Sequence, residues 1–158
     1  MMPQRLLVPL FQRPYVWNEK DQWEPLWRDL ERVAERASQG GIVQPHFIGA
    51  VVLQGVNAQV GAMSESIIID GQQRLTTLQL LLDAIHAEAT LAGATQAAGR
   101  LEMLIQNADV YCRQPEDRFK VWPTNRDRAA FHEVMGAPPP IDHAALRHAS
   151  SPLVKAHA

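Results

Sequence analysis

Residues 66–78 constrain the fold more than any other part of the chain. They open with Ile67, Ile68 and Ile69, a β-branched run that predicts a buried strand. Asp70 and Gly71 then favour a turn, because Gly accepts backbone angles that other residues avoid. Apolar residues at three- and four-residue steps predict an amphipathic helix next, with Leu75, Leu78, Leu82, Ile85 and Ala89 on one face.

The turn from this strand into this helix predicts an anion site. Free N–H groups and the positive end of the helix dipole lie at a helix start, where phosphate is the usual anion. The first helical turns add amides, a guanidinium and hydroxyls, from Gln72, Gln73, Arg74, Thr76 and Thr77. A purely structural interpretation stays open, in which Asp70 caps the helix and Arg74 is a solvated charge. Neither the P-loop nor the Rossmann fingerprint occurs.

A second candidate anion contact lies near the N-terminus. Residues 5–9 predict a short strand that ends at proline. Aromatic residues then surround Gln12 and Arg13, and Pro14 holds Arg13 in an extended conformation. The guanidinium could therefore offer a fork-shaped donor set to an anion. Equally, the aromatic side chains could fill the core while Arg13 faces water.

Two further elements precede the predicted strand at residues 66–70. Asn18 and Asp21 predict a helix start. Because Pro25 follows, either the first turn is separate or the main helix starts near Glu24 with Pro25 in its opening turn. The helix is expected to end at Gly40, with its tryptophans in the core. Residues 47–53 are continuously apolar and predict a central strand. Gly49 within it implies close approach of a helix or a ligand to the backbone. Residues 54–65 predict a hairpin loop.

The C-terminal half predicts three more elements. An apolar stripe over residues 101–112 predicts a helix in which Cys112 is buried. Residues 119–123 predict a short strand, and Thr124 with Asp127 caps a helix over residues 125–135 that closes at Gly136. Residues 137–158 are interpreted as a short helix, a frayed end or the start of a further region, so the domain is expected to span residues 5–136.

Composition excludes several classes of protein. The net charge of −2 argues against strong, sequence-independent binding to DNA. A single cysteine excludes an intrachain disulfide and fits a reducing cytoplasm, which we expect to be the location. No run reaches membrane-spanning length, and the histidines lack metal-ligand spacing, so neither a membrane contact nor a metal site is predicted.

Four segments of the chain together resemble one family. They are residues 9–17, 47–53, 69–78 and 120–127, and the Asp-Gly-Gln-Gln-Arg string at residues 70–74 is the most specific. In order and spacing they are similar to the N-terminal domain of GmrSD-type restriction systems, the DGQQR family. The resemblance covers residues 5–135.

The resemblance implies an α+β fold of the ParB/sulfiredoxin-like kind, a small mixed β-sheet packed with helices. It also implies binding and hydrolysis of a nucleoside triphosphate, GTP or ATP, in defence against foreign DNA. The residues expected to act in catalysis are Asp70, Gln73 and Arg74. Those expected to bind the nucleotide are Gln12, Arg13, Gly49, Gly71, Gln72, Thr76 and Thr77, with Gly49 on the strand beneath the site.

These expectations define a nucleoside-triphosphatase domain. Arg74 and Arg13 would hold phosphate oxygens and a glutamine would orient water, while Asp70 would hold a Mg²⁺-bound water or orient the turn. The alternative is a non-catalytic sensor of a nucleotide or of modified DNA that regulates a nuclease elsewhere, because the motif lacks a His or Glu base. A plain scaffold is the third hypothesis.

The family resemblance also bears on DNA. Its members commonly continue into a C-terminal HNH-type nuclease, and the residues after Met135 lack the His and Asn set of such a nuclease. DNA cleavage by this chain is therefore not expected, and DNA contact is expected through a full-length protein. The sequence leaves open whether subunits form a homo-oligomer.

Overall fold

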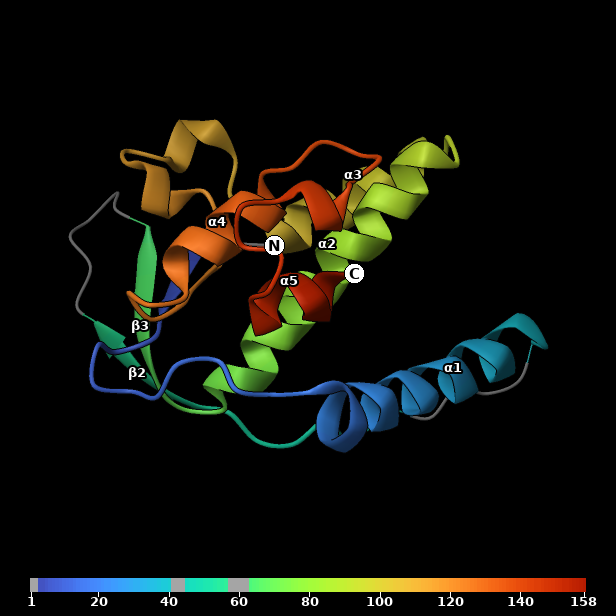
Figure 1. The fold of residues 1–158 in the computed structure, drawn as a ribbon, viewed down its shortest axis with the longest axis horizontal. Coiled ribbons are helices and arrows are strands. Elements are labelled where there is room, and N and C mark those ends of the chain that lie inside the picture. The colour runs from blue at the N-terminus through green and yellow to red at the C-terminus, as the bar shows by residue number, and fades with distance from the viewer. Residues whose placement is uncertain (1–2, 41–44, 57–62) are drawn as a thin grey trace.

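A mixed β-sheet forms one side of the molecule (Figure 1). The computed structural model describes residues 3–40, 45–56 and 63–158. Within these residues the sheet has four strands in the order β2-β3-β1-β4. The strands are β1 (Gln4–Leu7), β2 (Val52–Val56), β3 (Ser64–Asp70) and β4 (Val121–Trp122). β1 is parallel to both β3 and β4, whereas β2 is antiparallel to β3. The predicted α+β class is confirmed.

Helices make up most of the rest of the described chain. The longer ones are α1 (Glu24–Ser38), α2 (Gln72–Leu91), α3 (Thr95–Ile105), α4 (Arg128–Met135) and α5 (Pro152–His157). Short helical turns are η1 (Glu19–Trp23), η2 (Asp109–Tyr111), η3 (Pro115–Asp117) and η4 (His143–Ala145). None of the helices in the described ranges has the length and the apolar character needed to cross a membrane.

The main core lies where α2, α3, α4 and α5 meet the end of the sheet at β4. Phe119 and Phe131 are fully buried there, with their rings edge to face at 5.6 Å between centroids. Such aromatic pairs stabilise a core beyond the apolar area that they bury. A second cluster joins the strands to one another through Leu6, Val8, Ile68 and Val121.

The buried face of α2 is not the one that the leucine pattern predicted. Ile85 on the predicted face is exposed, and the leucines at 75, 78 and 82 are half-buried. The buried residues are Gln72, Gln73, Thr76, Thr77, Gln79, Leu80, Asp83 and Ala87. Polar side chains are buried here because neighbouring segments supply hydrogen-bond partners. Gln79, for example, donates its side-chain amide to the carbonyl of Ile105 at 3.2 Å.

The prediction of a central strand over residues 47–53 is wrong. β2 begins only at Val52, lies at the edge of the sheet and is exposed along its whole length. Gly49 has a φ of +106°, a left-handed conformation that interrupts the extended chain before β2. The antiparallel pairing of β2 with β3 confirms the predicted hairpin, but its loop is shorter than residues 54–65, because β2 continues to Val56 and β3 begins at Ser64. Residues 57–62 of its loop lie outside the described residues.

α1 extends away from the rest of the molecule (Figure 1). The Asn18 side chain accepts a hydrogen bond from the Asp21 N–H at 3.1 Å, and Pro25 lies in the opening turn of α1, as predicted. No residue of α1 is buried, and Trp27 is 50% exposed, so the expectation that both tryptophans lie in the core is wrong for Trp27. Trp23 does contact the main core.

The predicted helix over residues 101–112 ends earlier, at Ile105. The chain turns away there because the Asn107 N–H bonds to the carbonyl of Arg118 at 2.8 Å. Cys112 therefore lies outside the helix and is half-buried, not buried as predicted. α4 ends at Gly136 as predicted but begins at Arg128, after the turn that starts at Thr124.

Residues 137–158 pack against the domain. Leu153 and Val154 of α5 are fully buried in the main core, so the short-helix interpretation of this segment is observed. The buried His157 bonds to Asp83 of α2 at 3.0 Å and to His143 at 2.9 Å. Packing thus continues past residue 136, where the sequence suggested a boundary.

Candidate functional site

The strand-to-helix turn between β3 and α2 is the centre of the candidate site. Gly71 precedes the first turn of α2 with a left-handed φ of +92°, and no side chain caps the helix. Asp70 is exposed and does not act as the cap that the structural interpretation proposed. The left-handed φ favours glycine at position 71, and a Cβ atom there would lie 3.0 Å from a methyl carbon of Val51, which would have to shift.

The loop after β1 is attached to this turn by amide side chains. Gln12 donates to the carbonyl of Ile69 at 3.1 Å. Gln72 donates to the side-chain oxygen of Gln12 at 3.3 Å and to the carbonyl of Arg13 at 3.1 Å. The motif around Gln12 and the motif around Gln72 are far apart in the sequence, and these bonds bring them side by side. The family resemblance implied this arrangement.

Gln73 bonds to the same loop with both ends of its amide. Its oxygen accepts from the Val16 N–H at 2.9 Å, and its nitrogen donates to the carbonyl of Pro14 at 3.0 Å. The side chain that the sequence marked as catalytic is therefore buried and engaged with the loop backbone.

Tyr15 anchors the middle of the loop. Its hydroxyl bonds to Thr77 at 2.6 Å and accepts from the Trp23 indole at 2.9 Å, and burial raises its pKa. Its backbone N–H donates to the carboxylate of Asp127 at 2.9 Å, which also accepts from the Thr124 hydroxyl at 2.7 Å. Sequence reasoning assigned Asp127 only to a helix cap. Its place in the fourth family motif was the signal that it contacts the site.

Arg74 connects the turn to the segment before β2. Its guanidinium donates to the carbonyl of Ala50 at 2.5 Å. A Cβ atom at position 49 would lie 2.7 Å from the central carbon of that guanidinium. The close approach that Gly49 implied is therefore made by the Arg74 side chain, and Gly49 lies in a loop, not on a strand beneath the site.

Charged groups remain exposed around this turn. The side chains of Arg13 and Asp70 are exposed, and Arg74 is half-buried. In the part of the chain that the structure describes, none of the three forms an ion pair. Thr76, by contrast, is buried under the helix start with only 3% of its surface exposed. Of the predicted site residues, Arg13, Asp70 and Arg74 are thus the charged groups accessible to a ligand.

Two cavities lie elsewhere among the described residues. An open groove of about 910 Å³ runs between α1, α2 and the C-terminal segment and is lined mainly by apolar residues, with Thr77 at its edge. A smaller polar cavity of about 280 Å³ lies beside Arg5. Neither is lined by Arg13, Asp70 or Arg74.

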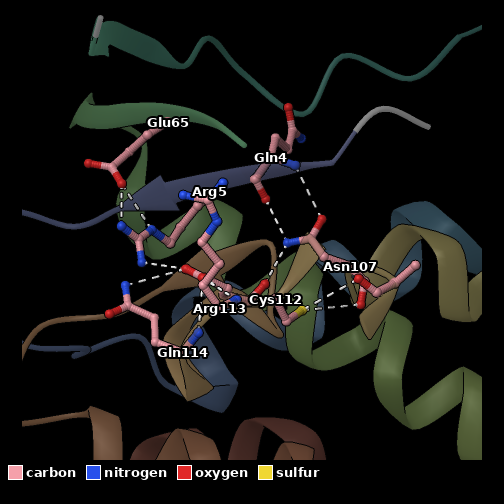
Figure 2. A network of polar contacts seen from close by, with 9 residues as sticks. Gln4, Arg5, Glu65, Asn107, Cys112, Arg113 and Gln114 are labelled. Atoms are coloured by element: carbon pink, nitrogen blue, oxygen red, sulfur yellow. Dashed lines mark hydrogen bonds and ion pairs between the residues drawn. The ribbon is translucent and has the colours of Figure 1, made fainter. Parts of the chain in front are cut away.

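The smaller cavity borders a polar network at the opposite end of the sheet (Figure 2). Arg5 lies between the carboxylates of Glu65 and Asp117 and bonds to both. Asp117 also accepts from the backbone N–H groups of Arg113 and Gln114. No sequence pattern predicts this network, because its members are far apart in the chain and share no motif.

The same network holds two unusual groups near Asn107. Buried Lys120 donates to the Asn107 side chain at 2.8 Å, and burial lowers the pKa of this lysine. Burial and then the carboxylate of Asp109 raise the pKa of the Cys112 thiol. A thiol with a raised pKa is a poor nucleophile, so Cys112 is not suited to nucleophilic chemistry.

Comparison with protein families decides what kind of domain this is. The family of the GmrSD restriction endonuclease, N-terminal domain, matches residues 2–151. The chain belongs to this family. No curated protein matches the chain. As a GmrSD N-terminal domain it is related to restriction and so to defence, and the match continues past residue 136 to residue 151, directly before α5.

Proposed function

We propose that the chain binds a nucleoside triphosphate, GTP or ATP, with its phosphates at the start of α2, and hydrolyses it. One observation carries the proposal. The loop after β1, the segment before β2 and the β3–α2 turn all meet there, through Gln12, Gln72, Gln73 and Arg74. This convergence brings the loop that carries Arg13, and the guanidinium of Arg74, to an uncapped helix start, an arrangement suited to phosphate.

The roles follow from accessibility. Arg13 and Arg74 would bind phosphate oxygens, and the N–H groups of the first turn of α2 would donate to the same group. Phosphoryl transfer requires mainly positioning and neutralisation of charge, which these groups supply while water attacks the terminal phosphorus. The exposed carboxylate of Asp70 fits either expected role, holding a water on Mg²⁺ or orienting the turn.

Gln72 and Gln73 are better described as positioning residues. Both donate to the backbone of the loop that carries Arg13, so they fix the position of the backbone from which the Arg13 side chain extends. Orienting water with Gln73 would break its bonds to Pro14 and Val16. We therefore assign the phosphate contacts to the arginines and the geometry of the loop to the glutamines.

The engagement of Gln73 also favours the second candidate function, a nucleotide sensor without turnover. The residues at 70–74 include no His or Glu that could act as a base. A bound nucleotide would then regulate a nuclease located elsewhere, and DNA contact would come through a full-length protein. Both functions share the phosphate site and differ only in hydrolysis.

Calorimetric titration with each of the four nucleoside triphosphates and Mg²⁺, together with phosphate release, tests the proposal. Arg74→Ala should weaken binding about 10- to 100-fold, because a charged hydrogen bond to phosphate is lost. Arg74→Lys keeps the charge and should recover part of the affinity. Arg100→Ala removes an exposed arginine of α3 and serves as the matched control.

The outcomes separate the two functions. Binding with phosphate release supports hydrolysis, and binding without release supports the sensor. If wild type and Arg74→Ala are both folded and bind every nucleotide with equal affinity, the phosphate site does not lie at the start of α2.

A further inference from the structure

Two phenylalanines on the loops beside the candidate site are unusually exposed. Phe11 is 84% exposed and Phe47 is 81% exposed, the highest values among the aromatic residues that the structure describes. Apolar rings are normally buried, because removal of their surface from water is favourable. Exposed large apolar side chains that gather at one place mark a surface that binds something.

Both residues belong to the loops that contact the start of α2. Phe11 directly precedes Gln12, whose side chain bonds to Ile69 and Gln72. Phe47 lies two residues before Gly49, which packs against the Arg74 guanidinium. In Figure 1 the blue loop after β1 and the teal segment before β2 both pass the lower end of α2.

The sheet places these loops on opposite sides of the turn. β3 lies between β2 and β1, and its C-terminal end leads into α2. The loop with Phe11 leaves the C-terminal end of β1, and the segment with Phe47 enters the N-terminal end of antiparallel β2. The segments that carry Phe11 and Phe47 therefore lie on either side of the turn that carries Asp70 and Arg74.

We propose that Phe11 and Phe47 bind the base of the nucleotide whose phosphates contact Arg13 and Arg74. The inference rests on the proposed function, since it adds a base contact to that phosphate site. A nucleoside triphosphate has a charged end and a flat aromatic end, and the two kinds of exposed residue match these ends. Stacking on an aromatic ring tolerates every base and favours purines, which have the larger face.

The test compares ATP with inorganic tripolyphosphate, which has the phosphates and no base. Phe11→Leu and Phe47→Leu keep an apolar side chain of similar bulk and remove the flat ring. Each should weaken ATP binding about 5- to 50-fold in calorimetry, because stacking on one ring is lost. Tripolyphosphate affinity should not change, and the loss should be larger for ATP than for UTP. Tyr111→Leu, an exposed aromatic at the opposite end of the sheet, is the control.

Each contrary result has a distinct meaning. If both phenylalanine variants bind ATP like wild type, the base contact is refuted while the phosphate site stands, and the two rings are then surface for a protein partner. Equal losses for ATP and tripolyphosphate would also refute it, since the rings would then only shape the phosphate site. If Arg74→Ala binds tripolyphosphate like wild type, the proposed function fails and the base contact fails with it.

Discussion

The two ends of the sheet differ in what their charged groups contact. At one end Arg5 lies between Glu65 and Asp117, and the side chain of Asp117 is only 8% exposed. At the other end Arg13 and Asp70 are exposed, and neither forms an ion pair within the residues that the structure describes. A charge already paired inside the protein stabilises the fold, whereas an accessible charge is available to a ligand. The comparison therefore separates the end whose charges are paired within the protein, the structural end, from the end where we propose that phosphate binds, the proposed binding end.

The largest effect on stability is expected from a substitution at the structural end. Arg5→Ala leaves two carboxylates facing each other without their cation, and a poorly exposed charge that loses its partner is costly. We expect a loss of about 3 kcal/mol in the free energy of unfolding, measured by urea denaturation. Arg100→Ala should change it by less than about 0.5 kcal/mol. A loss below about 1 kcal/mol in Arg5→Ala would mean that this end is not structural.

Asp127→Ala should loosen the loop that carries Arg13. The substitution leaves the Tyr15 N–H and the Thr124 hydroxyl without their acceptor. Unfolding free energy should fall by about 2 kcal/mol, because a donor close to the core is left unpaired. Asp109→Ala, at an exposed aspartate, should have little effect. If the two variants unfold at the same urea concentration, the Asp127 contact does not hold the loop.

Gln73→Leu tests the positioning role against a matched glutamine. Gln73 and Gln79 are both buried on α2 and both donate to backbone carbonyls, but Gln73 contacts the loop and Gln79 contacts α3. Each Leu substitution should cost about 1 kcal/mol of stability. Only Gln73→Leu should also weaken nucleotide binding. Weakening by both variants to the same degree would show a general effect of destabilising α2.

The smallest expected effect lies away from both ends, at the junction of α5 with α2. Burial and then the neighbouring His157 lower the pKa of His143, while Asp142 opposes the shift. His157 faces Asp83, and Lys155 also lies on this surface. The unfolded chain thus binds a proton on His143 at a higher pH than the folded chain does. Stability should therefore fall as the pH drops through about 6.5.

Urea denaturation at pH 8 and at pH 5.5, in wild type and His143→Gln, measures this dependence. The variant should lose less stability on acidification than wild type. Equal losses in the two proteins would assign the pH dependence to other groups.

The proposed binding end was more predictable from sequence than the structural end. Gly71 and Arg74 were found because they lie in a strand-to-helix pattern, and the loop around Gln12 was found because it matches a family motif. The Arg5 network could not be found, because Arg5, Glu65 and Asp117 meet only after β1 and β3 pair and residues 106–119 fold against them.

Hydrophobic patterning failed where partners from other segments decide burial. On α2 the buried face carries glutamines and threonines, because their amides and hydroxyls bond to the backbone or side chains of other segments. In residues 47–53 a continuous apolar run has no fully buried member, because Gly49 turns the chain before an edge strand. Local sequence fixes neither outcome, since both depend on contacts between distant segments.

The central claim is that phosphates bind at the start of α2. A crystal structure with a non-hydrolysable nucleoside triphosphate and Mg²⁺ tests it most directly. The account predicts phosphate oxygens within hydrogen-bond distance of Arg74 and of the first N–H groups of α2, with Arg13 turned toward them. A nucleotide seated in the groove between α1 and α2, or beside Arg5, would contradict it.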